Sequence, residues 1–161
     1  MLLHICRWLQ ENSFIALING TAWSAAATEI IHYFSKFILV GSMFIVDLRV
    51  LGLVARRQDA SQLADHLFPW MWVSLALNFL SGFVMFAGSA TAYYRNDIFY
   101  DKLGIVLLAI VANILVQQKV RAWNRLPAMP AWAKLVAVVS IGLWIGAIVA
   151  GVEVPALTGV G

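Results

Sequence analysis

The residues best suited to chemistry in this sequence are one imidazole, one ammonium and two carboxylates that share a single predicted helix. Glu29, His32 and Lys36 stand close together, and Asp47 follows further along the same apolar segment. At about 100° per residue, these four side chains fall within roughly 60° of one another around the helix axis. Arg49 points to the opposite side of that helix. One helix face therefore carries both signs of charge and a histidine.

Two interpretations of this face stay open, a structural one and a functional one. In the structural interpretation, Glu29 and Lys36 form an ion pair along the helix, and His32 packs between them. In the functional interpretation, His32 offers a neutral imidazole to a metal or a haem, or relays a proton, and Glu29 orients it from one helical turn away. Glu29 and Lys36 then belong to the cofactor site together with His32.

Ligands near the N-terminus form a second candidate site, for copper(I). Met1, His4 and Cys6 lie in the first turns of the chain. A short helix at the end of the bundle would bring these soft ligands to His32. Cys6 is the single cysteine, which excludes an intramolecular disulfide and a CxxC metal motif. His66 is predicted about 20 Å from His32 along the membrane normal, so the two do not ligate one haem together. Copper and haem b are both candidate cofactors.

The composition excludes the soluble classes of protein. Of 161 residues, 62% are hydrophobic and only 12% are charged, whereas roughly 25% of a soluble domain is charged. The mean hydropathy is +0.84. A net charge of +3, scattered along the chain, is too small for a nucleic-acid-binding surface. The sequence holds no glycine-rich phosphate loop and no nucleophile elbow, so we expect no enzyme activity of its own.

Four apolar segments are long enough to cross a hydrocarbon core of about 30 Å. We expect these spans at residues 24–54, 67–94, 98–119 and 133–152, in one domain that covers residues 1–161. Short polar links make consecutive helices antiparallel neighbours. The sequence therefore predicts an all-α fold, an integral membrane four-helix up-down bundle.

The links and the N-terminal segment carry further expectations. Residues 55–66 are predicted to form a polar link, and Pro69 suits the first turn of the helix that follows. Residues 2–18 are predicted to form one short amphipathic helix at the outer membrane interface. Cys6 is expected among the side chains of this interfacial helix that face the lipid.

Basic residues determine the predicted orientation. The first and third links hold seven of the eleven Lys and Arg residues, namely Arg49, Arg56, Arg57, Lys119, Arg121, Arg125 and Lys134. Because basic residues concentrate in cytoplasmic loops, both termini are predicted on the other side of the membrane, in the periplasm. The protein is thus expected to be a multi-pass protein of the bacterial inner membrane.

Polar residues and glycines on the other helices favour helix packing. Asn78 on the second span, and Lys102 and Asn113 on the third, are intramembrane polar residues with contacts to neighbouring helices. Gly142 and Gly146 form a GxxxG motif, a close-packing surface inside the chain or between protomers. The expected partners are the lipid bilayer and either other membrane subunits or a second copy of the chain.

Several segments together carry a resemblance to a known family. They are EIIH at 29–32, VDLRVLGL at 46–53, FPW at 68–70, GFVMF at 82–86 and SIGLW at 140–144. The pattern resembles an uncharacterised family of four-helix bacterial inner-membrane proteins, which is similar to the copper-resistance protein D (CopD) domain. The resemblance implies a bundle that handles copper or haem at the periplasmic face, and it places the functional residues at Glu29, His32, Asp47, Arg49 and Lys102.

Three residues depart from the pattern of the related domains. Gln117 and Gln118 stand late in the third span, where those domains often carry a further histidine. Glu153 stands where they tend to carry a basic residue. A lost ligand would turn a cofactor protein into a structural one.

Three functions are therefore compatible with the sequence. The first is CopD-like handling of copper, or of haem and electrons, at the periplasmic face. The second is a non-catalytic subunit that anchors or stabilises a larger membrane complex. The third is a small transporter or proton path along Glu29, Lys36 and Asp47. A visible spectrum and a metal analysis of the purified protein separate the first from the second.

The predicted orientation has a direct test. A reporter enzyme that works only in the periplasm is expected to be active when it is fused after Gly161, because the basic links stay in the cytoplasm. Activity of a cytoplasm-specific reporter alone at this position would show that the orientation is wrong.

Overall fold

A computed structural model describes residues 2–158, and for Leu2 and residues 153–158 it describes the backbone without the side chains. These residues form seven α-helices and no strand. Four helices are long: α3 (Ala22–Val50), α4 (Ala60–Gly88), α6 (Asp97–Asn124) and α7 (Ala131–Thr158). Three are short: α1 (Leu2–Gln10), α2 (Ser13–Asn19) and α5 (Ala90–Tyr93). The predicted all-α four-helix bundle is confirmed.

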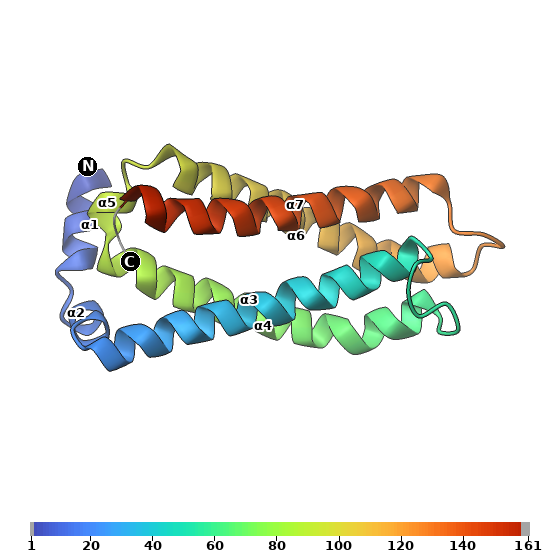
Figure 1. Cartoon of the computed structure of the whole chain (residues 1–161), viewed down its shortest axis with the longest axis horizontal. Coiled ribbons are helices and arrows are strands. Elements are labelled where there is room, and N and C mark those ends of the chain that lie inside the picture. Colours follow the sequence, from blue (N-terminus) through green and yellow to red (C-terminus); the bar gives the residue numbers. More distant parts are fainter. Residues whose placement is uncertain (1, 159–161) are drawn as a thin grey trace.

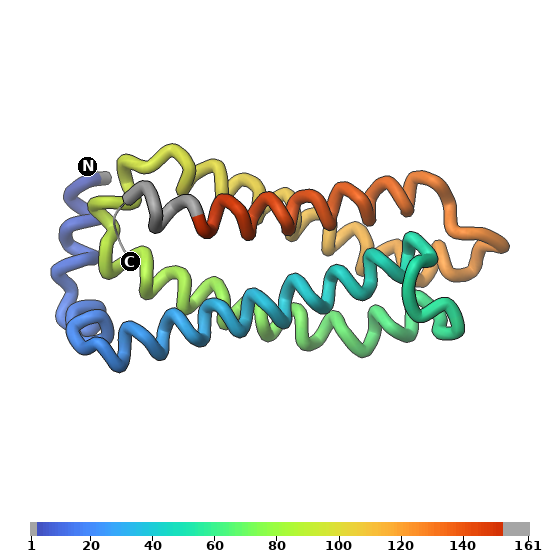
Figure 2. The backbone as a smooth tube through the Cα atoms, in the orientation of Figure 1, coloured from blue at the N-terminus to red at the C-terminus, as the bar shows by residue number. Residues whose placement is uncertain are grey.

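The long helices run up and down in two antiparallel pairs (Figure 1). α3 packs on α4, and α6 packs on α7; α3 also contacts α7, and α4 contacts α6, so the four helices form a closed ring. The short helices α1, α2 and α5 lie together at one end, as the tube in Figure 2 shows. We call this the terminal end, and we call the other end, where α3 connects to α4 and α6 to α7, the loop end.

The four long helices are apolar enough to cross a membrane. Their mean hydropathies in the most apolar stretch are 1.5 for α3, 1.6 for α4, 2.0 for α6 and 2.5 for α7. Large apolar side chains cover their outward faces, among them Phe37, Phe79, Leu107 and Leu135. A soluble monomer rarely exposes so much apolar surface. The length and composition of these helices therefore indicate a multi-pass membrane protein.

Local side-chain chemistry sets several helix limits. The Thr21 hydroxyl accepts a hydrogen bond from the Ser24 N–H and caps the start of α3. Asn96 caps α6 in the same way, through the N–H of Phe99. After α3 ends, Gly52 adopts a φ of +77°, a conformation that favours glycine.

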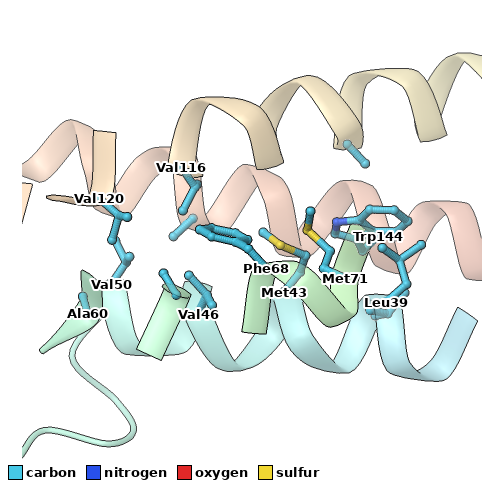
Figure 3. Packing of buried hydrophobic residues seen from close by; sticks show 14 of the residues in the cluster. Leu39, Met43, Val46, Val50, Ala60, Phe68, Met71, Val116, Val120 and Trp144 are labelled. Carbon is cyan, nitrogen blue, oxygen red and sulfur yellow. The ribbon is translucent and has the colours of Figure 1, made fainter. Parts of the chain in front are cut away.

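The core of the bundle is apolar and built from all four long helices. Leu39 and Met43 of α3, Met71 of α4 and Trp144 of α7 are buried next to one another in its middle (Figure 3). We call these four residues the apolar layer. Asn113 of α6 joins them, because its amide accepts a hydrogen bond from Trp144 Nε1 at 3.2 Å and lies 3.5 Å from Met71 Sδ. The apolar layer separates the polar side chains of the terminal end from those of the loop end.

The second long helix begins earlier than the sequence indicates. α4 begins at Ala60, so residues 60–66 of the predicted polar link are helical. The Ala60 N–H donates to the side chain of Asn124 at the end of α6, which satisfies a free backbone group of the first turn. Pro69 consequently lies inside α4 instead of in its first turn. The polarity of residues 60–66 reflects exposure at the loop end.

The same helix also ends earlier than predicted. α4 ends at Gly88 instead of continuing to residue 94, and α5 forms a separate turn after Ser89. Asn19 of α2 packs against Gly88, where an added Cβ would lie 2.8 Å from Asn19 Cγ. The docking of α2 at this position accompanies the break in the helix.

The N-terminal segment forms two helices where one was predicted. Asn12 separates them, and its side chain accepts the Phe14 N–H at 3.0 Å as the cap of α2. α1 packs on α4 and α5, and Cys6 is buried, with 7% of its surface exposed. The expectation that Cys6 faces lipid is therefore wrong, because α1 packs its inner face against the protein.

The GxxxG motif does not pack closely within the chain. Gly142 is exposed, with no atom within 4 Å of the position that a Cβ would occupy, and Gly146 approaches only Ile105, at 3.7 Å. The buried face of α7 is formed by other residues, namely Ala133, Ala137, Ser140, Trp144 and Ala147. A role of the glycines between protomers stays a prediction.

This difference between two faces of α7 can be measured. Ala137→Leu should lower the free energy of unfolding by about 1–3 kcal/mol, because Ala137 is fully buried and the larger side chain overpacks the core. Gly142→Leu should leave the monomer at least as stable, since its side chain meets open space. Thermal unfolding in detergent compares the two variants, and a larger loss for Gly142→Leu would contradict this packing.

Candidate functional site

His32 lies near the terminal end of α3 and is held by α4. Its Nδ1 lies 3.1 Å from the backbone oxygen of Asn78 and 3.2 Å from Ser81 Oγ. Because a carbonyl oxygen only accepts, Nδ1 carries the proton and donates to Asn78. The remaining nitrogen, Nε2, is then the one with a free lone pair in the neutral ring. α4 thus fixes both the orientation and the tautomer of His32.

The other side of the imidazole is available to a ligand. Among the residues that the structure describes, Nε2 has no hydrogen-bond partner. It is also not fully buried, because it is absent from the set of polar atoms that are both completely enclosed and unpaired. His32 lines a small open cavity of about 50 Å³. The ring therefore presents an electron pair at the wall of a cavity.

Close packing between α3 and α4 keeps the ring in place. An added Cβ at Gly82 would lie 3.1 Å from His32 Cε1, so the glycine makes room for the imidazole. The Asn78 side chain donates to the backbone oxygen of His32 at 2.8 Å and lies 3.3 Å from Ser35 Oγ. Asn78 is therefore a helix-packing residue, as expected, and also the main support of His32. The prediction that Glu29 orients the imidazole is wrong, because the partner of Nδ1 comes from another helix.

Two lysines from different helices meet beside His32. A Cβ at Gly151 of α7 would lie 3.5 Å from Lys36 Nζ of α3 and 3.7 Å from Lys102 Nζ of α6. The Lys36 ammonium also lies 5.1 Å from the centre of the Tyr33 ring, within the range of a cation–π contact. We call His32, Lys36 and Lys102 the cationic site. All three line this cavity of about 50 Å³ and a second one of about 40 Å³.

Aromatic rings form the other wall of the larger cavity. Phe86 and Phe99 stack with their centres 5.3 Å apart, and Tyr93 lies 5.2 Å from Phe99. Tyr93 belongs to α5, and burial raises the pKa of its phenol, with smaller contributions from Tyr33 and Glu29. Its hydroxyl therefore stays neutral at physiological pH. The cavity combines cationic groups with an aromatic surface.

No carboxylate neutralises the two lysines among the side chains that the structure describes. The ion pair found there joins Arg121 and Asp65 at the loop end, at 2.9 Å. The predicted pair of Glu29 and Lys36 is not formed: Glu29 is exposed, whereas Lys36 extends toward α6 and α7. The ion pair of Glu29 and Lys36 that the structural interpretation predicts is therefore wrong.

The remaining predicted residues lie apart from the cationic site. Asp47 is fully buried toward the loop end, and Arg49 donates to the backbone oxygen of Gln58 at 2.7 Å. Asn113 lies in the middle of the bundle beside the apolar layer. Lys102 is predicted from helical periodicity as an intramembrane polar residue and from the resemblance as a functional one. Its approach to Lys36 depends on which helices are neighbours.

The proposed copper ligands are only partly described. Met1 lies outside the described residues, His4 is exposed on α1, and Cys6 is buried beneath it. Among the side chains of residues 3–152, no three His, Cys, Asp or Glu residues form a group that could hold a metal ion. A copper site of Met1, His4, Cys6 and His32 stays a prediction that no contact in the described part supports.

The space for the imidazole suggests a variant at Gly82. Gly82→Ala should displace the His32 ring, change its NMR chemical shifts and lower the melting temperature, because the new methyl group would lie 3.1 Å from Cε1. Gly104→Ala is the matched control, since a Cβ there meets open space. Unchanged His32 signals in Gly82→Ala would contradict the close contact.

Comparison with known proteins identifies a family without a known activity. No curated protein and no solved structure matches the chain. A family model, described as a family of unknown function (DUF6644), matches residues 6–155. The expectation of an uncharacterised family is thereby confirmed, and the similarity to CopD stays a prediction. Because the match runs from within α1 into the last turn of α7 and so covers most of the chain, the chain belongs to the DUF6644 family.

Proposed function

We propose that this protein is a multi-pass membrane protein that binds an anionic ligand in the cationic site. The observation that carries this proposal is the meeting of Lys36 and Lys102 at Gly151, without a carboxylate within 4 Å among the described side chains. Charged groups inside a membrane bundle usually face one another or a ligand and serve a function.

Electrostatics favours an anion between the two ammonium groups. At a separation of roughly 7 Å and an effective dielectric constant of about 20, two unit charges repel by about 2 kcal/mol. Both lysines are partly buried, so water screens them less than it would at an open surface. A carboxylate or phosphate between the lysines replaces this repulsion with two charge-assisted hydrogen bonds.

His32 and the aromatic wall favour a ligand that carries, besides its negative charge, a metal ion or a flat apolar part. Haem b is the candidate that the resemblance to CopD implies. The types of donor fit it, but the cavity of about 50 Å³ is too small for a porphyrin unless the helices at the terminal end move apart. A histidine that donates its other N–H to a backbone carbonyl is the usual form of a metal-bound histidine. Lys36 and Lys102 would hold its two carboxylates, and His32 would offer a nitrogen to its iron. The haem iron would supply one-electron transfer, which is the second candidate function.

Copper handling has less support than anion binding. The described residues do not bring three metal-binding side chains together.

The terminal end would face the periplasm in the predicted orientation, so an anionic or redox-active ligand would be exchanged on that side. The proposed anchoring role in a larger complex would use the exposed face around Gly142.

Glu153 offers an internal alternative to a bound ligand. It stands two residues after Gly151 on α7, and the structure describes its backbone but not its side chain. If Glu153 were the counter-ion of the lysines, Glu153→Gln would destabilise the protein and open the site. If a ligand is the counter-ion, Glu153→Gln leaves ligand binding unchanged or makes it tighter.

Ligand binding by variant proteins tests the proposal. The protein, purified in lipid nanodiscs, is expected to carry a bound anion that native mass spectrometry detects. Lys36→Met and Lys102→Met should each lose it or weaken binding about tenfold or more, since truncating a charged partner costs at least about 1.4 kcal/mol. Lys119→Met, an exposed lysine of the same helix as Lys102, is the control and should retain binding.

A visible spectrum of the same samples separates the ligand classes. A Soret band that disappears in His32→Phe and persists in His66→Phe identifies haem, because His66 is exposed at the loop end. Stoichiometric copper without a Soret band would favour the copper proposal instead. Equal ligand content in wild type, Lys36→Met and Lys102→Met would contradict a function of the cationic site.

A further inference from the structure

Asp47 is a fully buried carboxyl group far from the cationic site. Its side chain is 0% exposed, and neither of its oxygens has a hydrogen-bond partner of normal geometry among the described residues. It faces Ser140 of α7, which is also 0% exposed. The Ser140 hydroxyl likewise has no hydrogen-bond partner of normal geometry among the described residues. Val46 and Val50, its neighbours on α3, pack in the apolar core together with Val116 and Val120 (Figure 3).

No positive charge compensates this carboxyl group. The Arg49 side chain turns away to the backbone oxygen of Gln58, and Arg121 pairs with Asp65. The other basic side chains of α6 and α7 near this end are exposed: Lys119, Arg125 and Lys134. An ionised carboxylate without a partner in such surroundings costs several kcal/mol, so the group must bind a positive species or become neutral.

The number of oxygen ligands argues for a proton over a metal cation. Ca²⁺ takes six to eight oxygen ligands, and Mg²⁺ requires a nearly complete octahedron. Asp47 and Ser140 provide three side-chain oxygens between them, and no group of three metal-binding side chains includes Asp47 in the described part of the chain. A proton needs only one oxygen and no space.

Asp47 lies close to the loop end of α3. Asp47 precedes the end of α3 at Val50 by three residues, about 5 Å along the helix axis. Lys36 is about 16 Å away in the other direction, and Leu39 and Met43 of the apolar layer lie between them. Asp47 therefore lies much nearer to the loop end than to the cationic site.

We infer that Asp47 and Ser140 form a proton-binding site in the loop-end half of the bundle. The carboxylate takes a proton from hydronium, which leaves water, and the resulting acid donates its new O–H toward Ser140. Complete burial without a compensating charge favours the uncharged acid at this position. This site is separate from the anion-binding function proposed above and does not depend on it.

Infrared spectroscopy of the full chain in lipid nanodiscs tests this inference. At pH 7 the wild type should show the C=O stretch of a protonated carboxyl group, and the band should be lost in Asp47→Asn. Asp65→Asn is the control, because Asp65 is an exposed carboxylate paired with Arg121. The band should remain unchanged in this control.

A second variant keeps the test decisive if Asp47→Asn does not fold. Ser140→Ala retains the carboxyl group and removes the hydroxyl that faces it, so the C=O band should shift without being lost. Addition of sodium, potassium or magnesium at constant pH should have no effect on the wild-type band. Absence of any band that responds to either variant at pH 7 would overturn the inference, as would loss of the band on adding one of these cations.

Discussion

Lys36 and Lys102 place two positive charges beside one backbone position, Gly151, inside a bundle whose outer surface is apolar. Three helices must be adjacent for this to occur, and the ring of α3, α4, α6 and α7 provides that adjacency. Like charges in such surroundings are unfavourable unless an anion lies between them or one of them loses its proton. The functional interpretation of the terminal end rests on this constraint. The cavity, the aromatic wall and the open nitrogen of His32 surround the same point.

The two ends of the bundle use polar groups in different ways. At the terminal end, Asn78 and Ser81 satisfy one side of the imidazole and leave the other side available. At the loop end, Asp47 is enclosed completely and has no compensating charge in the described residues. The apolar layer lies between these groups, and Asn113 satisfies Trp144 within it. The polar residues of the helices therefore do not form one continuous path across the bundle.

The sequence predicts the bundle well because hydrophobic runs are long and the links between them are short. It predicts the helix limits less well: residues 60–66 are polar because they are exposed, yet they are helical. The candidate site shows a similar limit. The face that holds His32 and Lys36 follows from helical periodicity, but the partner of His32 is on α4 and the second lysine is on α6. Neither follows from periodicity within one helix, because each depends on which helices are neighbours and on how they are rotated. The near alignment of Lys102 with Asn113 on one face of α6 was the available signal that Lys102 points inward.

The stability of the ligand-free protein tests most directly whether the two lysines lack an internal counter-ion. The free energy of unfolding of wild type and Lys102→Met should be compared in detergent after removal of bound anions. The account predicts that Lys102→Met is at least as stable as the ligand-free wild type, because the substitution removes a repulsion, and that added anions stabilise only the wild type. A Lys102→Met protein that is clearly less stable than ligand-free wild type, together with a wild type that added anions do not stabilise, would contradict it.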